Sequence, residues 1–217
     1  MRRNFLRSRG VFEFGNGLQF NGVDTIVDGI NYPVNFINYS VSFWVKYNGG
    51  SSYVYAGTGA NDNNNSLAIL SSTFMRIWDF LGNVSNFNPN LIIGQKTHFL
   101  ISVGNGYANV YKDGGLIANI PSFLGGVNIG KLGSRGGAGF LNGVLDEISI
   151  CIGYEATAQD AIDLYNAGLG DFATSVLSNV VGYYRCNQVD GDTLLIDSRN
   201  NQDGVLNNFV APYFVPF

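Results

Sequence analysis

Hydrophobic and polar residues alternate along much of this chain, and the alternation predicts β-strands. In SVSFWVK (40–46), Val, Phe and Val alternate with Ser, Trp and Lys, so Trp44 is expected to pack on a sheet rather than to bind a ligand. In FMRIWDF (74–80), Trp78 falls on the face opposite to Ile77. Because successive side chains of a strand point to opposite faces, both segments predict half-buried strands.

Further short strands are expected wherever the same alternation lies between turns rich in Gly and Asn. They cover residues 17–27, 51–57, 66–72, 97–120 (a strand pair turning at Gly104-Asn105-Gly106) and 127–134. The Asn-rich stretch TGANDNNN (58–65) between two of them is expected to be a solvent-exposed loop. This succession of short strands and turns predicts an all-β, antiparallel sandwich.

The segment GFLNGVLDEISICIGYEATAQDAIDLYNAG (139–168) combines a turn, an alternating strand and a short helix. The helix is expected over 157–167, with Thr157 as its N-cap and Gly168 as its left-handed stop. This ending resembles that of the laminin-G-like, concanavalin A-like jelly-roll family of lectins and glucanases. The resemblance implies an antiparallel β-sandwich jelly roll with one short helix near 157–167.

The resemblance also implies one domain. It covers about 17–168 and 181–208, so we expect a single jelly roll over 13–209 between a basic arm, 1–12, and an apolar tail, 210–217. Residues 180–209 resemble the opening segment of these domains but follow the helix instead. They are either the start of a truncated second repeat or part of a circularly permuted domain. A lone hairpin would leave its apolar face exposed, which favours permutation.

Charge divides the chain into a basic start and an acidic body. The 217 residues carry 12 Lys and Arg against 16 Asp and Glu, a net charge of −4. Arg2, Arg3, Arg7 and Arg9 precede every acidic residue, and removing these four charges leaves −8 for the rest. The arm is expected either to dock on an acidic neighbour or to be a solvated terminus, and the acidic body argues against nucleic-acid binding.

No segment predicts secretion or a membrane span. The basic start lacks the apolar stretch of about 7 to 15 residues of a signal peptide. No run reaches about 18 consecutive apolar residues, the length that a membrane helix needs. The chain is therefore expected either to be made in a cytoplasm or to have lost a leader.

Catalytic chemistry is not expected. Glu13, Glu147 and Glu155 are the only glutamates, and none lies in the E-x-D-x-x-E spacing of related glucanases. Asp146 and Glu147 are adjacent on a strand, so they are expected to point to opposite faces and cannot flank one glycosidic bond. His98, the only histidine, is expected to be structural.

The two cysteines are expected to be unpaired. Alternation places Cys151 on the face opposite to Ile148, whereas Cys186 shares the presumed core face of Tyr184. Thiols on opposite sides of a sheet do not form a disulfide.

A structural Ca²⁺ is the one cofactor that the resemblance implies, with Asp24 and Asp146 as ligands. Asn21 stands where the family usually has a further Asp, so one charge is lost. A second candidate lies in DSRNNQDG (197–204), whose Asp and Asn side chains are equally interpreted as turn formers.

Glycan binding would use surface aromatics and amides. The candidates are Tyr53, Tyr55, Trp78, Asp79 and the loop Asn61–Asn65. The alternative is that Trp78 packs between the sheets and the asparagines only form turns.

Together these features favour a non-catalytic surface component of a larger assembly, such as a phage or virus virion protein (capsid decoration, fibre or tail-associated) that can contact cell-surface glycans. Such a component would be a homo-oligomer or a lattice component on the virion surface. It would dock through the arm and the tail, with Arg2, Arg3, Arg7, Arg9, Tyr213, Phe214 and Phe217 as candidate contacts. The alternative is a free, extracellular carbohydrate-binding lectin or adhesin module, and an enzyme is the weakest hypothesis.

Overall fold

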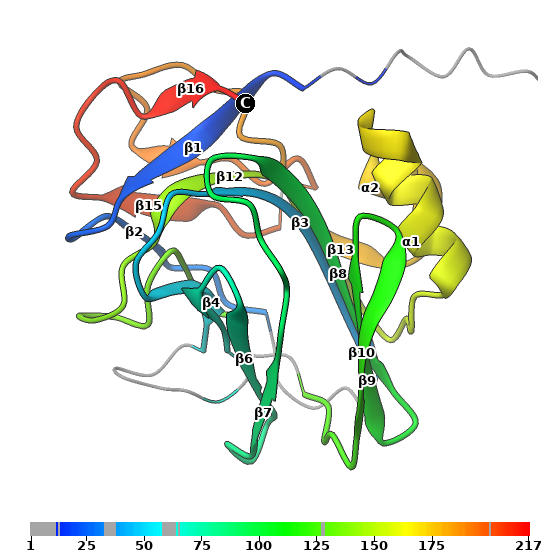
Figure 1. The fold of residues 1–217 in the computed structure, drawn as a ribbon. Coiled ribbons are helices and arrows are strands. Elements are labelled where there is room, and N and C mark those ends of the chain that lie inside the picture. Colours follow the sequence, from blue (N-terminus) through cyan, green and yellow to red (C-terminus); the bar gives the residue numbers. More distant parts are fainter. Residues whose placement is uncertain are drawn as a thin grey trace, which may run out of the picture.

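A computed structural model describes residues 12, 14–32, 38–57, 64, 66–126, 129–199 and 201–217. The four arginines of the basic arm and most of the Asn-rich loop lie outside the described residues. Within them, the strands form two antiparallel sheets that pack face to face, with two short helices against one sheet (Figure 1). The predicted all-β sandwich is confirmed.

The first sheet contains the long central strands. Its order is β10-β9-β8-β3-β12-β1-β16, and β13 pairs with β12 beside this path. The bounds are β1 (Asn16–Asn21), β3 (Tyr39–Tyr47), β8 (Lys96–Gly104), β9 (Tyr107–Lys112), β10 (Gly115–Pro121), β12 (Asn142–Ile152), β13 (Val180–Tyr184) and β16 (Phe214–Pro216).

The second sheet has shorter strands, in the order β14-β15-β2-β11-β4-β5-β6-β7. The bounds are β2 (Ile26–Asp28), β4 (Ser52–Ala56), β5 (Leu67–Ser71), β6 (Phe74–Trp78), β7 (Val84–Phe87), β11 (Lys131–Leu132), β14 (Leu194–Leu195) and β15 (Gly204–Asn207).

The core lies between the two sheets and follows the predicted alternation. Val41, Phe43 and Val45 of β3 all point inward and are fully buried. Phe43 stacks on Phe99 of the neighbouring β8, with ring centroids 5.6 Å apart. Trp44 points to the opposite face, where it packs at 3% exposure as expected.

The helices cover the outer face of the first sheet. Helix α1 (Ala158–Tyr165) begins after Thr157, whose side chain accepts from the Asp160 N–H in a capping box. The left-handed residue that ends it is Asn166, with φ 45°, and not the predicted Gly168; a 3₁₀ turn, η1 (Asn166–Gly168), follows. Asn tolerates this conformation better than most residues, so the helix ends earlier than expected.

A second helix, α2 (Ala173–Val176), was not predicted, because four residues are too short for a periodic pattern. Apolar residues from both helices pack on outward residues of the first sheet, including Leu100 and Cys151. No helix within the described ranges is both long and apolar enough to cross a membrane.

The C-terminal segment completes both sheets. Strand β13 pairs with β12, setting Tyr184 opposite Ile148, while β15 pairs with β2 in the other sheet. Tyr184 and Cys186 lie in the same core as Phe43. Residues 180–209 are therefore part of the sandwich.

The apolar tail is also built into the fold. Strand β16 pairs with β1, and Figure 1 shows the C-terminus beside it. Tyr213 and Phe214 are each only 6% exposed, and the ring of Phe217 lies 5.6 Å from that of Phe14. This corrects the expectation that Tyr213 and Phe214 are docking contacts, because their apolar surface is already used within the chain.

The two cysteines are free and buried on opposite sides of the first sheet. Cys151 lies beneath the helices and Cys186 lies in the core between the sheets. The prediction of unpaired thiols is confirmed, although Cys151 is covered by the helical layer rather than exposed.

Replacing Phe214 by Ala tests the integration of the tail. We expect the free energy of unfolding to fall by about 3 kcal/mol, because the change removes a buried aromatic ring and leaves a cavity. Val210→Ala is the matched control: its side chain is 84% exposed, so a change within about 0.5 kcal/mol is expected. Urea denaturation measures both, and equal stabilities would show that the tail is not part of the core.

Candidate functional site

Two of the three aromatic residues predicted to contact glycans, Tyr53 and Trp78, lie on the outer face of the second sheet. The register of β4 on β5 shifts between Tyr53 and Tyr55, which inserts Val54 as an extra residue. The shift leaves Tyr53 on the outer face and turns Tyr55 into the core at 2% exposure. Tyr55 is therefore removed from the candidate glycan contacts.

Trp78 lies on the outer face, next to Tyr53. Their rings stack with centroids 5.6 Å apart and an interplanar angle of 20°, above the small side chains of Ala56 and Ala68. The alternative that Trp78 packs between the sheets is wrong, since Ile77 occupies that side. Tyr53 is 7% exposed and Trp78 is 6% exposed, so the pair is a packed layer of this face and offers little surface to a ligand.

Asp79 follows Trp78 and is not presented to solvent. At 1% exposure, its carboxylate accepts hydrogen bonds from the backbone N–H groups of Leu81 and Asn83 and from the Asn83 side chain, all between 2.8 and 2.9 Å. This carboxylate shapes the turn between β6 and β7, and does not line the aromatic surface.

The accessible part of this surface comes from residues that the sequence reasoning did not select. Phe74 and Arg76 share the outward face of β6 with Trp78, and Phe74 is 36% exposed. The Arg76 guanidinium lies 5.6 Å from the Phe74 ring centroid and 5.5 Å from that of Trp78. Its Nε donates to Oδ1 of the exposed Asn86 on β7 at 2.9 Å.

We call these five residues, Tyr53, Phe74, Arg76, Trp78 and Asn86, the aromatic face. The signal that could have found Arg76 was the i, i+2, i+4 spacing of Phe74, Arg76 and Trp78, which places all three on one side of a strand. Arg135 adds a second guanidinium 5.4 Å from the Tyr53 ring centroid.

The two predicted calcium ligands are not brought together. Asp24 is exposed in the turn after β1, where its carboxylate accepts from Asn21 Nδ2 at 2.7 Å. Asn21 pairs with Asn142, which precedes Asp146 by four residues, or about 13 Å along β12. Asp24 and Asp146 therefore do not fit one calcium ion, and the described residues contain no cluster of three acidic, His or Cys side chains placed to hold a metal.

The second calcium candidate is saturated by the protein itself. Asp197 is fully buried and accepts from the N–H groups of Tyr183, Arg199, Asn201 and Gln202 at 2.8 to 3.2 Å. The turn-forming interpretation accounts for this carboxylate. Asn200, which follows in the same segment, lies outside the described residues. Calcium binding elsewhere stays a prediction.

Asp146 and Glu147 lie on the same side of the first sheet, contrary to the prediction. The register of β12 on β3 shifts between Asp146 and Ser149, and Glu147 adopts φ 49°. This bulge turns both carboxylates toward the outer face. Glu147 accepts from the Tyr183 hydroxyl and pairs with Arg185 at 3.5 Å, whereas Asp146 Oδ1 accepts the Glu147 N–H at 2.8 Å.

Burial dominates the electrostatics of this acidic pair. Desolvation, reinforced by the charge of Glu147, raises the pKa of Asp146 to about 8, and burial also raises the pKa of Glu147. Asp146 is fully buried, and its Oδ2 has no hydrogen-bond partner among the described residues. A protonated carboxyl avoids the larger cost of an ionised group in this position.

His98 is structural, as expected. It is 1% exposed, and its Nε2 lies 2.8 Å from the Ser42 hydroxyl. Burial lowers its pKa to about 3, so the ring is neutral over the ordinary pH range.

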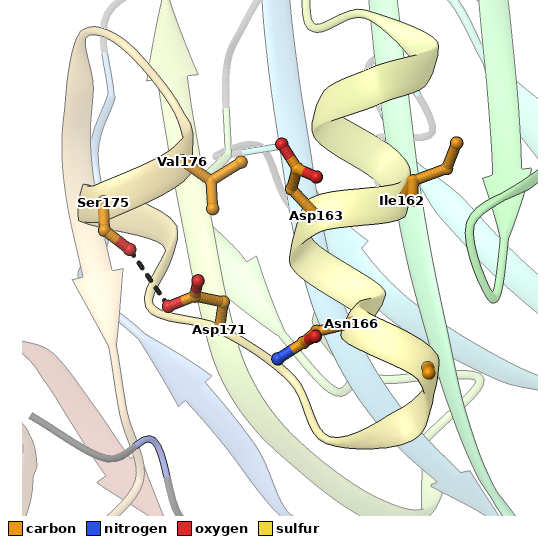
Figure 2. Close-up of a pocket in the computed structure, with 7 residues that line it drawn as sticks. Ile162, Asp163, Asn166, Asp171, Ser175 and Val176 are labelled. Atoms are coloured by element: carbon orange, nitrogen blue, oxygen red, sulfur yellow. Dashed lines mark hydrogen bonds between the residues drawn. The ribbon is translucent and has the colours of Figure 1, made fainter. Parts of the chain in front are cut away.

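A polar groove of about 520 Å³ separates α1 from α2 (Figure 2). It is lined by Ile162, Asp163, Asn166, Ala167, Asp171, Ser175 and Val176. Ser175 donates to Asp171 Oδ1 at 3.1 Å, and Figure 2 shows the Asp163 side chain on the facing helix. The groove thus presents two carboxylates that the sequence reasoning did not select.

No protein-family model and no curated protein matches this sequence. Solved structures nevertheless resemble its fold. A candidate carbohydrate-binding protein from Bacteroides ovatus has a TM-score of 0.70 at 12% identity, covering 92% of this chain and 60% of its own. The heptameric SAP-like pentraxin from Limulus polyphemus has a TM-score of 0.61 at 13% identity, covering 92% and 95%.

The chain has the antiparallel jelly-roll β-sandwich fold that these structures share. Domain 4 of the extracellular arabinanase AbnA from Geobacillus stearothermophilus, solved in complex with arabinotriose, has a TM-score of 0.51 at 22% identity and covers 75% of this jelly roll and 80% of its own chain. This chain spans only 60% of the length of the Bacteroides ovatus protein. At such identities the likeness establishes the fold, and function must be argued from the side chains.

The buried Asp146 predicts a stability that depends on pH. Its pKa is raised from 3.8 to about 8, so its stabilising contribution is complete below pH 3.8 and is lost as pH rises toward 8. His98 acts in the opposite sense, because its lowered pKa removes stability as pH falls through 6.5. Between pH 6.5 and 8, the free energy of unfolding should therefore fall by up to about 1.4 kcal/mol per pH unit.

Asp146→Asn is expected to flatten this slope in urea denaturation. Glu147, whose pKa is also raised, adds to the trend in the same direction. The control is Ser149→Ala, a buried side chain on the same strand that does not titrate, and it should keep the wild-type slope. An unchanged slope in the Asp146 variant would assign the pH dependence to another group.

Proposed function

We propose that this chain is a non-catalytic carbohydrate-binding module and that the aromatic face is its glycan-contact surface. The observation that carries the proposal is the row Phe74, Arg76 and Trp78, stacked side by side on a sheet face that points away from the helices. Asn86 and Arg76 add a hydrogen-bonding edge to the same surface.

This combination suits the chemistry of a sugar. One face of a pyranose ring is lined with C–H groups, which pack on an aromatic ring, while its rim of hydroxyls both donates and accepts hydrogen bonds. Phe74 offers an exposed ring, and Asn86 offers an amide that both donates and accepts. The stacked and buried rings of Tyr53 and Trp78 form part of the same face.

The structural neighbours support the same reading. The Bacteroides ovatus protein is a candidate carbohydrate-binding protein, and the arabinanase domain was solved with arabinotriose. A shared fold alone does not transfer a ligand, so the support is general and concerns the class of ligand only.

The acidic groups support a module without catalysis. A glycosidase needs two carboxyl groups on either side of an accessible bond, about 5 to 9.5 Å apart. Asp146 and Glu147 are instead adjacent and at most 4% exposed, and Glu147 is held by Tyr183 and Arg185. Neither carboxylate reaches a polysaccharide from this position.

Alanine variants of the accessible residues test the binding surface. We expect Phe74→Ala and Asn86→Ala each to weaken binding to an oligosaccharide selected on a glycan array by about tenfold, or about 1.4 kcal/mol. Isothermal titration calorimetry measures the affinity, and thermal unfolding checks that the variants remain folded. Both side chains are exposed, so the midpoints should stay close to that of the wild type.

The matched control is Val205→Ala, an exposed position on β15 in the same sheet but away from the aromatic face. Its affinity should equal that of the wild type. Binding that survives both aromatic-face variants would place the glycan elsewhere, and release of reducing ends from the oligosaccharide would contradict the non-catalytic assignment.

We further propose that the module is displayed on a larger assembly, such as a virus or phage particle, through its basic arm. Phe12, which follows the arginines of this arm in the sequence, packs on Phe172 with ring centroids 5.0 Å apart, and Phe172 is next in sequence to Asp171 of the helical groove. The arginines of residues 1–10 and the groove carboxylates have opposite charges, which suits contact between neighbouring copies. The pentraxin of the same fold is heptameric, which supports a ring-like association.

Deletion of residues 1–10 tests this association. The full chain is expected to form oligomers in light scattering at low salt and the truncated chain to be monomeric. Raising the salt from 0.1 M to 1 M should also dissociate the oligomers, because the screening length falls from about 10 Å to about 3 Å. The single variant Asp163→Asn, on the α1 side of the groove, should weaken the assembly as well if the groove receives the arm. A full-length chain that stays monomeric would contradict the proposal.

A further inference from the structure

We infer that the aromatic face selects acidic glycans and that Arg76 is the residue that recognises their carboxylate. This inference rests on the proposed glycan binding and names its ligand class. It starts from the contacts of Arg76, which hold a positive charge in one orientation at the centre of the accessible surface.

Three contacts fix the guanidinium of Arg76. Phe74 and Trp78 lie on the same strand, two residues before and two residues after it, and both rings are within 5.6 Å of the guanidinium carbon. The Nε–H is used by Asn86 Oδ1 at 2.9 Å. Because this hydrogen bond uses only the Nε–H, the two terminal nitrogens are left to form the fork that binds a carboxylate with two parallel hydrogen bonds.

The charge of Arg76 is not neutralised by the described part of the chain. Arg185 pairs with Glu147 on the other sheet, but no carboxylate among the described residues pairs with Arg76. The nearby carboxylate of Asp79 is buried and hydrogen-bonded to the turn at Leu81 and Asn83. A second guanidinium, that of Arg135, lies over the Tyr53 ring at the other end of the stacked pair. Among the described residues, the guanidinium of Arg76 is thus a cation without a paired carboxylate, in a chain of net charge −4.

The single unpaired charge of Arg76 on an acidic chain determines which kind of anion can bind. An acidic body repels a densely charged polymer over distances up to the screening length of about 8 Å at physiological salt. A single carboxylate at contact distance from Arg76, on a sugar ring packed over Phe74, gains a charge-assisted hydrogen-bond pair without that repulsion. The ligand class is thus a uronic- or sialic-acid-containing oligosaccharide, rather than a polysulfate or a nucleic acid.

Pairs of oligosaccharides that differ in the carboxylate test this inference on the full chain. The probes are trigalacturonic acid with its methyl ester, and sialyllactose with lactose. For the wild type we expect at least one acidic probe to bind tenfold or more tightly than its neutral partner in isothermal titration calorimetry. Arg76→Gln should bring that ratio close to one, and Arg76→Lys should restore only part of it, because an ammonium lacks the planar fork.

The matched control is Arg199→Gln, which removes the same charge from an exposed position in a loop outside the aromatic face. It should keep the wild-type ratio. Thermal unfolding of Arg76→Gln should stay close to the wild type, since the side chain is only half-buried and Gln keeps part of its stem. A lower midpoint together with an unchanged ratio would assign Arg76 a structural role and overturn the inference.

The outcomes separate the two proposals. If neutral and acidic probes bind equally, and binding still depends on Phe74 and Asn86, the carbohydrate-binding proposal stands and the acidic specificity is wrong. If a ratio in favour of the acid survives in Arg76→Gln, the anion is recognised by another group and the role of Arg76 is wrong. Binding of none of the four probes would overturn the stated ligand class.

Discussion

The fold depends on strand β12, which is shared by segments from both ends of the chain. One edge of β12 pairs with β3 along most of its length. The other edge pairs first with β1, from Asn142 to Leu145, and then with β13, from Ile148 to Cys151. Since β1 itself pairs with β16, the N- and C-terminal segments are both held by this one strand. Because β13 pairs with β12 and β16 pairs with β1, the C-terminal residues complete the sandwich. The apolar tail, which the sequence suggested as a docking segment, is a strand of the sheet.

The change of partner along β12 has a local cost. Asp146 and Glu147 lie at the junction between β1 and β13, where the register on β3 also shifts. The bulge places two carboxylates beneath the helical layer, where burial raises the pKa of both. Arg185 and Tyr183, from the incoming β13, supply partners for Glu147 only. Asp146 is left to hold a proton, so the closure of the sandwich by two segments is linked to the pH dependence of its stability.

The alternation of apolar and polar residues was sufficient to predict the layers of the fold. It failed wherever a strand departed from regular alternation. The inward row of Phe43 and the outward position of Trp44 follow from a period of two, as does the placement of Cys151 and Cys186 on opposite faces. The bulge after Asp146 placed Glu147 on the same outer face as Asp146 instead of the opposite one. A bulge adds one residue to the strand and shifts the alternation after it, and no residue type in the sequence marks its place. The early helix end at Asn166 has a different origin: Asn166, Ala167 and Gly168 all have positive φ, and the first of the three ends the helix.

The same kind of irregularity produced the candidate site. A regular β4 would have presented Tyr53 and Tyr55 together, and the core would have lacked the Tyr55 ring. The bulge sends Tyr55 inward and leaves Tyr53 alone opposite Ala68, whose small side chain gives room for Trp78 to stack across β5. The Trp78 ring of this stacked pair lies 5.5 Å from the Arg76 guanidinium, so the same pair contributes to the position of the cation. The sequence supplies every residue of the aromatic face, but their common surface exists because one residue of β4 is out of register.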